Sequence, residues 1–437
     1  MVSKNSNTTA TAQVLRLAHD GRGIAEINGK TIFLFGALPH ETVNFRYIRR
    51  QRQFDEGIVV EVLQASPERI QPLCIHADIC GGCRLQHLDS AAQLQYKQQI
   101  LIDQLQHFGK LMPPTDMLPP LCGTPWGYRR KARLSIRYVK KKEKLLIGFH
   151  EKQGRYVADL SLCEVLHPLV GKHLSELREI LEQLSICEAV PQIEVAIGDN
   201  AAVLVLRHLQ PLSASDKQLL LEFSDRYPII WYLQPGDPST ITPLAEPAAL
   251  EYALPAYELM LEFSPLDFVQ VNASINQKLV QQAIELLDIK PTDSVLDLFC
   301  GLGNFSLAIA RHAKNVVGVE GDISMVKKAL LNAQKNNISN ANFYAADLSQ
   351  NVSDRPWWKQ KYDKLLLDPA RAGALEIVQA IDQLDVKTIV YVSCNPATFA
   401  RDAGELVHKH GYELRKLGVL DMFPHTQHVE SISLFSK

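Results

Sequence analysis

The sequence predicts a multidomain protein with a small N-terminal β-barrel, a central β-rich domain and a C-terminal α/β domain built on a Rossmann-like parallel sheet. Three observations predict this fold class. The chain has 437 residues, enough for about three domains at about 150 residues each. Short alternating segments punctuated by glycines fill residues 13–64. Helix and strand patterns alternate beyond Phe268, as they do in parallel sheets.

The composition excludes several classes of protein. Hydrophobic residues make up 46% and charged residues 22% of the chain, which are ordinary globular values. The net charge is −2, so any nucleic-acid surface must be a local patch. No segment approaches the ~20 consecutive apolar residues of a membrane helix, and the polar N-terminus has no signal-peptide core. We expect a cytoplasmic monomer with a disordered tail over residues 1–12 and no obligate protein partner.

Residues 13–72 are expected to form the barrel. Five short strands in about fifty residues favour closure, because a closed sheet hides its edges. The segment 46–52 places four arginines and Tyr47 on one hairpin. A solvated hairpin tip is the plain alternative, but an OB-like barrel with a basic, aromatic loop is a common platform for single-stranded RNA.

The middle of the chain contains a helix, a linker and a β-rich domain. Apolar residues recur at helical spacing over residues 90–109, and four prolines between 113 and 120 then indicate a linker. Strand-like alternation follows, with one helix at 169–184. Residues 128–144 contain nine positive charges and one glutamate, beside Trp126. We interpret this basic stretch as an RNA contact rather than a merely solvated face.

A cofactor site is predicted where an apolar strand ends at Asp297 and a glycine loop follows. The loop, FCGLGNF, lacks the third glycine of a dinucleotide fingerprint. The next strand ends at Glu320, whose carboxylate can accept hydrogen bonds from ribose hydroxyls, and a third strand-like run offers Asp347 to an adenine edge. Asp297 and the missing glycine favour S-adenosylmethionine over NAD, because a methionyl ammonium needs a carboxylate and a pyrophosphate needs backbone amides. A strand–loop–helix without ligand is the alternative.

A reactive cysteine is predicted in the same domain. Cys394 follows an apolar strand, at the edge where doubly wound sheets bind ligands, and Asp368 follows another strand. A buried core cysteine is the bland alternative. Pyrimidine C5 is a poor nucleophile, so its methylation needs a thiolate that adds at C6 and a base that removes the C5 proton. One cysteine, one carboxylate such as Glu430 and one S-adenosylmethionine pocket are the minimum set.

The motifs DLFCGLGNFSLAIA, LLLDPARAGA, VSCNPATFARD and HVES resemble those of the RNA 5-methyluridine methyltransferases, and the N-terminal barrel resembles a TRAM domain. The likeness covers nearly the whole chain and is strongest to members that act on uridine 1939 of 23S ribosomal RNA. It implies a class I methyltransferase domain over residues 92–125 and 267–437. It also implies that Cys394 is the nucleophile and Glu430 the proton acceptor. The implied S-adenosylmethionine contacts are Gln270, Phe299, Asn304, Glu320, Asp347 and Asp368.

A group of cysteines predicts a metal centre in the central domain, which we assign to residues 73–91 and 126–266. Cys74, Cys80 and Cys83 form a C-x5-C-x2-C pattern, and Cys163 lies far away in the chain. Zinc sites usually have two close C-x2-C pairs, so this spacing is more typical of an iron–sulfur site. The resemblance implies a [4Fe–4S] cluster on these four cysteines, with a structural or RNA-binding role.

Two other functions remain open at this point. One is the same chemistry on another rRNA or tRNA uridine, and the other is a non-catalytic RNA-binding assembly factor with a vestigial fold. The intact set of Cys394, Asp368 and Glu430 argues against the second.

Overall fold

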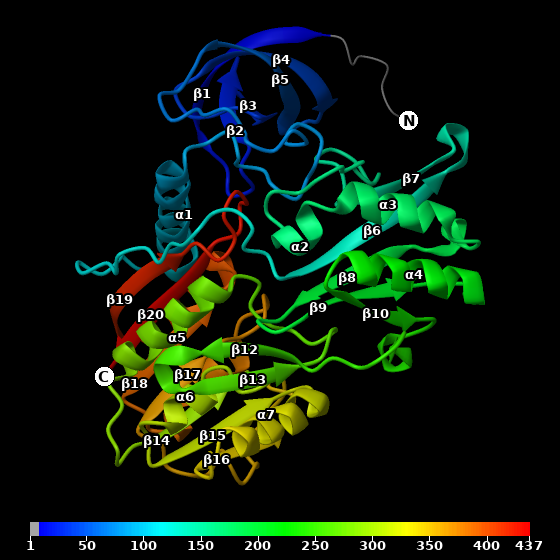
Figure 1. Ribbon diagram of the computed structural model, residues 1–437. Coiled ribbons are helices and arrows are strands. Elements are labelled where there is room, and N and C mark those ends of the chain that lie inside the picture. The colour runs from blue at the N-terminus through cyan, green and yellow to red at the C-terminus, as the bar shows by residue number, and fades with distance from the viewer. Residues whose placement is uncertain (1–7) are drawn as a thin grey trace. The chain divides into compact units, whose positions relative to one another are not determined.

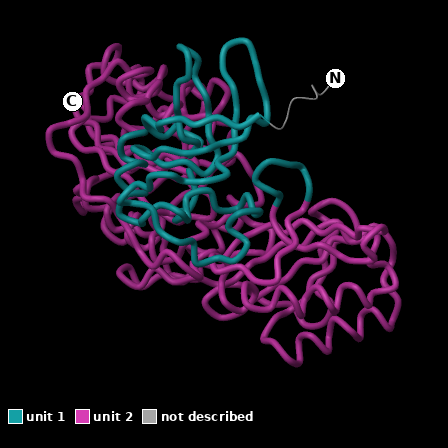
Figure 2. Tube along the Cα trace, turned by 90° about the horizontal axis from the view of Figure 1, so that it is seen from above, with its two compact units in different colours: residues 1–100, 150–156, 423–427 teal, residues 101–149, 157–422, 428–437 magenta. Residues whose placement is uncertain are grey.

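The computed structural model describes residues 8–437, and the chain divides into two compact units (Figure 2). The first unit comprises residues 1–100, 150–156 and 423–427, and the second comprises residues 101–149, 157–422 and 428–437. Residues 1–7, part of the predicted tail, lie outside the described residues. None of the described helices is both long and apolar enough to cross a membrane.

The first unit begins with a closed five-stranded barrel, which confirms the predicted N-terminal β-barrel (Figure 1, blue). Its order is β1-β2-β3-β5-β4, and alternate side chains such as Val14, Leu34 and Phe45 fill the interior. The strands are β1 (Thr9–Leu17), β2 (Gly23–Ile27), β3 (Lys30–Phe35), β4 (Thr42–Arg50) and β5 (Phe54–Gln64).

The predicted tail over residues 1–12 is too long. Strand β1 begins at Thr9, and residues 9–13 pair with residues 42–46 of β4. The alternation of threonine with alanine suits a strand that has one face on the barrel core, and Ala12 is buried there. The pattern looked like a polar tail because only the small alanines face inward.

The first unit also contains most of α1 (Ser90–Gln104) and a segment from near the C-terminus. The Gln93 side chain donates to the Leu85 and Leu88 carbonyls at 3.0 and 2.8 Å and accepts from the His425 N–H at 2.8 Å. The Lys97 side chain is fully buried and donates to the Phe423 carbonyl at 2.9 Å. Residues 423–427 are therefore built into the packing of the first unit.

The second unit contains a six-stranded sheet of order β11-β10-β9-β8-β6-β7. Its pairs are antiparallel except β9 with β10, which α4 connects in a parallel crossover. The strands are β6 (Lys131–Val139), β7 (Lys144–Gly148), β8 (Gln192–Ile197), β9 (Ala202–Arg207), β10 (Ile229–Gln234) and β11 (Thr242–Pro243). The helices are α2 (Pro168–Gly171), α3 (Leu174–Gln183) and α4 (Ala214–Arg226).

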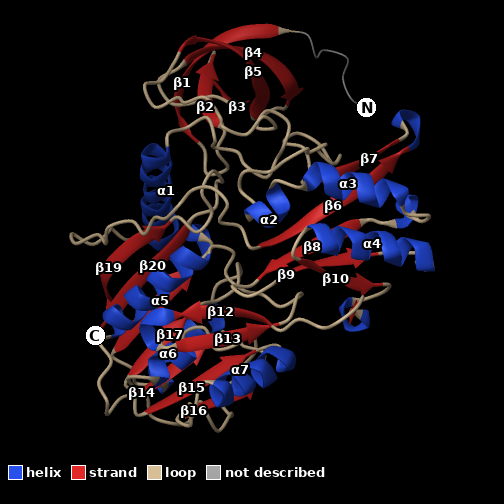
Figure 3. Cartoon of the chain, in the orientation of Figure 1, coloured by secondary structure: helices blue, strands red, loops and turns tan. Residues whose placement is uncertain are grey.

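A two-stranded antiparallel hairpin, β12 (Leu250–Leu254) and β13 (Leu259–Phe263), follows this sheet in the chain. Beyond it lies a seven-stranded sheet of order β16-β15-β14-β17-β18-β20-β19 (Figure 3). Strands β14 to β18 are parallel, and β20 is antiparallel to both β18 and β19. This sheet confirms the predicted Rossmann-like α/β domain. Its strands are β14 (Ser294–Leu298), β15 (Asn315–Glu320), β16 (Ala341–Ala345), β17 (Lys364–Leu367), β18 (Thr388–Ser393), β19 (Glu413–Leu420) and β20 (Glu430–Ser436).

Three helices of this domain, α5, α7 and α9, begin at polar caps that the sequence supplies. Asn272, Asp322 and Asn395 each accept a backbone N–H of the first turn, and Pro396 occupies the first helical position after Asn395. Helix α5 packs on β18 and β20, α7 on β15 and β16, and α9 on β19. The helices are α5 (Ala273–Leu287), α6 (Ser306–Ala310), α7 (Ile323–Lys335), α8 (Leu375–Gln379) and α9 (Pro396–His408).

Candidate active site

The predicted site residues gather at one edge of the seven-stranded sheet. Glu320 ends β15, Asp368 directly follows β17, and Cys394 directly follows β18. These strands are parallel, so their carboxyl ends share an edge. From β14 the chain runs outward through β15 to β16 and then crosses back to β17 on the other side of β14, and ligands bind at such a switch point.

The glycine loop after β14 is held against β15 by backbone bonds. The N–H groups of Phe299 and Cys300 both donate to the Val319 carbonyl, at 2.8 and 3.1 Å. Phe299 has a left-handed backbone with φ of 66°, which is strained for an aromatic residue, and Gly301 continues the turn with φ of 56°. The turn directs the backbone of the loop around the end of the strand.

Glu320 fastens this loop to the start of α7. Its Oε2 accepts the Gly301 N–H and its Oε1 accepts the Asp322 N–H, each at 3.1 Å. A carboxylate has about four acceptor positions, so two remain for a ligand. The residue can thus order the loop and still bind hydroxyl donors.

Carboxyl groups at the switch point create a negative environment. Asp297 is fully buried and accepts the Ser306 hydroxyl, while its Oδ1 has no hydrogen-bond partner within the described chain. Burial, together with the charges of Asp368 and Glu320, raises the pKa of Asp297 to about 7. Burial and then Glu320 raise the pKa of Asp368 to about 7 as well. A cationic ligand beside these groups would offset their mutual repulsion.

Cys394 and Glu430 are brought together by strand register. Strand β18 pairs antiparallel with β20, and the last pair joins Ser393 to Ser431. One further step along this ladder puts Cys394 opposite Glu430. Burial, then the charges of Glu430 and Asp368, raise the pKa of the Cys394 thiol to about 11, while Arg371 acts in the opposite direction. The site thus combines a half-buried thiol, a buried carboxyl group and a cation.

The loop that carries Asp368 and Arg371 is braced by α9. The Arg371 carbonyl accepts from Asn395 Nδ2 at 2.9 Å and from the Thr398 hydroxyl at 3.1 Å. Further along the loop, the Ala374 N–H donates to Asp402 Oδ2 at 2.7 Å.

Asp402 is the centre of this brace. It is fully buried, and its Oδ2 also accepts the Tyr391 hydroxyl at 2.7 Å, while its Oδ1 accepts Arg401 Nε at 2.8 Å. A Cβ at Gly373 would approach Asp402 Oδ2 to 2.6 Å, so glycine is required there. No pattern in the sequence indicates that Asp402 and Tyr391 support this loop, because only the folded packing brings them to it.

The other predicted cofactor residues differ in their surroundings. Asn304 is half-buried and hydrogen-bonds to Asn276 and Tyr252, two residues that the sequence analysis did not identify. Gln270 lies between β13 and α5, where the neighbouring Val271 carbonyl accepts the Arg130 N–H at 2.9 Å. Asp347 is exposed and comes two residues after β16. Its Oδ1 accepts the N–H and hydroxyl of Ser349, and these bonds lower its pKa.

The predicted metal residues are divided between the two units. Cys74, Cys80 and Cys83 belong to the first unit and Cys163 to the second. Burial, and the neighbouring Cys74, raise the pKa of Cys80, whose sulfur accepts the Gly82 N–H at 3.4 Å. Across residues 8–437, no three or more His, Cys, Asp or Glu side chains are arranged to hold a metal ion.

The basic stretch at 128–144 is partly neutralised by its own domain. Arg130, Arg133, Lys140 and Lys144 form ion pairs with Asp199, Glu194, Glu188 and Asp159, respectively. Lys131 donates to the Pro265 carbonyl at 2.5 Å, and burial lowers its pKa to about 8. Arg137, Lys141 and Lys142 remain exposed. The surface available for phosphate is therefore smaller than the count of charges suggests.

A solved structure shares the fold of this chain, and a family model matches its C-terminal part. The tRNA (uracil-54, C5)-methyltransferase of Pyrococcus abyssi, solved with S-adenosyl-L-homocysteine, aligns over 97% of this chain and 99% of its own, with a TM-score of 0.74 and 23% identity. A family model described as tRNA (Uracil-5-)-methyltransferase matches residues 254–437. Fold and sequence together define an S-adenosylmethionine-dependent RNA (uracil-C5)-methyltransferase.

Closer relatives place the chain within that class. Three relatives are named 23S rRNA (uracil(1939)-C(5))-methyltransferase RlmD. The protein from Xanthomonas campestris pv. campestris is 50% identical over 96% of both chains. The protein from Alkalilimnicola ehrlichii is 49% identical over 96% of this chain and 95% of its own, and that from Francisella tularensis subsp. novicida is 49% identical over 98% and 96%. The chain belongs to this RlmD family, which confirms the resemblance seen in the sequence motifs.

Proposed function

We propose that this chain transfers a methyl group from S-adenosylmethionine to C5 of uridine 1939 in 23S ribosomal RNA. The observation that carries the proposal is the identity of about one residue in two, over nearly the whole length, with relatives named for that reaction. The geometry supports it, because the register of β18 and β20 places a thiol opposite a carboxyl group at the ligand-binding edge. An rRNA substrate would place the enzyme in the cytoplasm.

In the proposed mechanism Cys394 is the nucleophile and Glu430 the base. The Cys394 sulfur forms a bond to C6 of the uracil, which makes C5 nucleophilic. S-adenosylmethionine, when bound, supplies the methyl group that C5 takes up. Glu430 then accepts the C5 proton, and the electrons of that bond expel the Cys394 thiolate from C6. The target base would be flipped out of its stack to reach the thiol.

The thiol must lose its proton before it can add. Its pKa of about 11 reflects burial and two nearby carboxyl groups. A cation beside Asp368 offsets part of this negative charge, so we expect the thiol to become more acidic in the cofactor complex. Arg371 already acts in that direction and would stabilise the thiolate.

We assign the cofactor to the glycine loop and the strand ends around it. The residues fit a cationic ligand, because Asp297 Oδ1 is buried without a hydrogen-bond partner among residues 8–437 and lies near the charges of Asp368 and Glu320. Glu320 retains acceptor positions for ribose hydroxyls, and Asp347 follows the adjacent strand. The proposed contacts are Gln270, Phe299, Asn304, Glu320, Asp347 and Asp368.

We also propose a [4Fe–4S] cluster on Cys74, Cys80, Cys83 and Cys163. Thiolates are the donors that such clusters require, and three of the four lie on one short loop. The Gly82 N–H that reaches the Cys80 sulfur is the type of donor that stabilises a bound thiolate. The reaction transfers no electron, so the cluster would have a structural or RNA-binding role.

A tRNA uridine is the second candidate substrate, because the matching family model and the Pyrococcus abyssi enzyme are both named for tRNA. The N-terminal barrel, which we assign as a TRAM domain, and the exposed Arg137, Lys141 and Lys142 are the proposed RNA-binding surfaces. Mapping 5-methyluridine in rRNA and tRNA of cells with and without the protein distinguishes the two. Loss at position 1939 of 23S rRNA alone is expected, and loss confined to tRNA would overturn the rRNA assignment.

The nucleophile is tested by Cys394→Ala. Turnover should fall below detection while the affinity for S-adenosylhomocysteine stays within about twofold of the native value, because the substitution removes only the thiol. RNA that contains 5-fluorouridine should form a covalent adduct with the native protein alone, since fluorine at C5 cannot leave as a proton does. Turnover by the alanine variant would exclude this nucleophile.

A further inference from the structure

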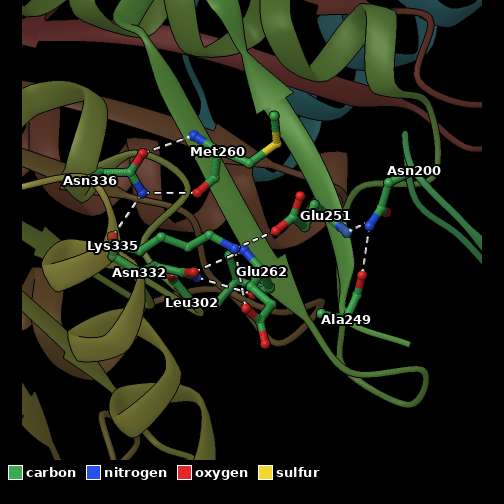
Figure 4. A network of polar contacts seen from close by, with 9 residues as sticks. All are labelled: Asn200, Ala249, Glu251, Met260, Glu262, Leu302, Asn332, Lys335 and Asn336. Carbon is green, nitrogen blue, oxygen red and sulfur yellow. Dashed lines mark hydrogen bonds and ion pairs between the residues drawn. The ribbon is translucent and has the colours of Figure 1, made fainter. Parts of the chain in front are cut away.

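The β12–β13 hairpin is docked on α7 by asparagine side chains (Figure 4). Met260 donates its N–H to Asn336 Oδ1 at 2.9 Å and accepts from Asn336 Nδ2 at 2.8 Å. Glu262 makes the same pair of bonds with Asn332, at 2.8 and 3.1 Å. The two asparagines are one turn apart, so their amides satisfy the outer edge of β13 as a neighbouring strand would. Lys335 adds ion pairs to Glu251 and Glu262.

This docking brings the hairpin to the glycine loop of the proposed cofactor site. Asn332 Nδ2 also donates to the Leu302 carbonyl at 3.2 Å. From β12, the Tyr252 hydroxyl donates to Asn304 Oδ1 at 2.9 Å. The loop is therefore bonded to the hairpin both directly, through Tyr252, and indirectly, through Asn332.

The hydrogen bonds of Asn304 leave it one unused group. Its Oδ1 accepts from Tyr252 and also from Asn276 Nδ2 at 2.9 Å, which uses both lone pairs. Its Nδ2 donates one hydrogen to Asn276 Oδ1 at 2.9 Å. Within residues 8–437 its second N–H has no partner, so Asn304 can bind a ligand only as a donor. Because Asn276 is buried and Tyr252 lies on strand β12 of the docked hairpin, the amide is held in this orientation.

We propose that Tyr252 is a positioning residue of the cofactor site, which fixes Asn304 so that its free N–H donates to the carboxylate of the methionyl group. The inference rests on the proposed function, in which Glu320 accepts from the ribose hydroxyls, and on the expected contact of Asp347 with the adenine edge. The carboxylate is the remaining strong acceptor of S-adenosylmethionine, since the ammonium and sulfonium groups are cations. A hairpin outside the Rossmann-like sheet thus forms part of the site.

The test compares two ligands that differ in the amino-acid group. S-adenosylhomocysteine has the carboxylate, and 5′-methylthioadenosine lacks the whole aminocarboxypropyl group. In Tyr252→Phe the Kd for S-adenosylhomocysteine should rise about fivefold, as expected for one hydrogen bond, while the Kd for 5′-methylthioadenosine stays unchanged. The KM for S-adenosylmethionine should rise by the same factor with kcat nearly unaltered, because the reacting groups are not touched.

Tyr257→Phe is the matched control. Tyr257 lies in the turn of the same hairpin, and within the described residues its hydroxyl makes no hydrogen bond. Both ligands should bind this variant as they bind the native protein. If Tyr252→Phe fails to fold, Asn336→Ala loosens the hairpin without touching Asn304 and should also weaken S-adenosylhomocysteine selectively, by a smaller factor.

Each outcome decides the proposal. Unchanged binding of both ligands by Tyr252→Phe would show that Tyr252 does not position Asn304. An equal rise in the Kd values of the two ligands would show that Tyr252 supports the loop in general and not the carboxylate contact. If native protein binds S-adenosylhomocysteine but methylates no rRNA, the proposed substrate fails, whereas the comparison of the two ligands still decides the role of Tyr252.

Discussion

Replacement of Glu430 by glutamine should make the thiol of Cys394 more reactive and at the same time stop product release. Glu430 is, after burial, the largest cause of the raised pKa of this thiol. At a pKa of about 11, only about one thiol in a thousand is ionised at pH 8. Every unit by which the pKa falls raises that fraction about tenfold. Removing the charge opposite Cys394 should therefore speed its alkylation several-fold or more.

The assay follows the alkylation of the Cys394 peptide by iodoacetamide, using mass spectrometry between pH 7 and 10. The profile of Glu430→Gln should be displaced toward lower pH relative to the native protein. Without the base, addition and methyl transfer can proceed but the C5 proton stays, so a methylated protein–RNA adduct should accumulate on denaturing gels. Glu413→Gln, an exposed position on neighbouring β19, is the control and should leave both readouts native.

Two results would refute this reasoning. Coincident alkylation profiles would show that the carboxyl group does not act on the thiol, and the inferred proximity of the two side chains would be wrong. Free methylated RNA released at the native rate would show that another group takes the C5 proton.

Three further predictions follow from other parts of the structure. The pKa of about 7 at Asp368 means that this carboxyl is neutral below pH 7 and charged above it, so the affinity for cationic S-adenosylmethionine should rise with pH between 6 and 8 in calorimetry. The affinity for uncharged-sulfur S-adenosylhomocysteine should change less, and equal slopes would contradict the assignment. In Asp402→Asn an amide NH2 group would face the three donors that the carboxylate accepts. The free energy of unfolding, measured by urea titration, should fall by about 2 kcal/mol. The control Glu405→Gln, on the same helix, should change it little. Protein purified without oxygen should be brown and contain iron, and stoichiometric zinc without iron would overturn the cluster assignment.

Sequence patterns predicted the elements better than the contacts between them. Alternation of apolar and polar residues, interrupted by glycines, was enough to predict the barrel. Its closure could be predicted because the edges of a small sheet need to be covered. The strand ends at Glu320 and Asp368 could be placed at one edge, because parallel strands share their direction. Helix α4 was not predicted, even though Ser213 and Asp216 form a capping box at its first turn.

The rest of the site depends on pairing that a single sequence does not encode locally. Nothing within the segment around Cys394 indicates that Glu430 lies opposite, since the register of β18 with β20 is set by a ladder that closes across more than thirty residues. Tyr252 is separated from Asn304 by a hairpin turn, strand β13, helix α5 and strand β14. Its role follows only from the docking of β13 on α7, which depends on asparagines at ordinary helical spacing.

The way the C-terminal region enters the first unit has a consequence for the order in which the protein can fold during synthesis. Residues 423–427 lie more than three hundred residues after α1, yet they supply carbonyl and amide partners to Gln93 and to the buried Lys97. A buried ammonium without its acceptor is costly, so the packing around α1 stays incomplete until residues 423–427 have been synthesised. The barrel can form early from consecutive strands, whereas the rest of its unit waits for this distant segment. Emergence of the first 100 residues from the ribosome is therefore not enough to complete the first unit.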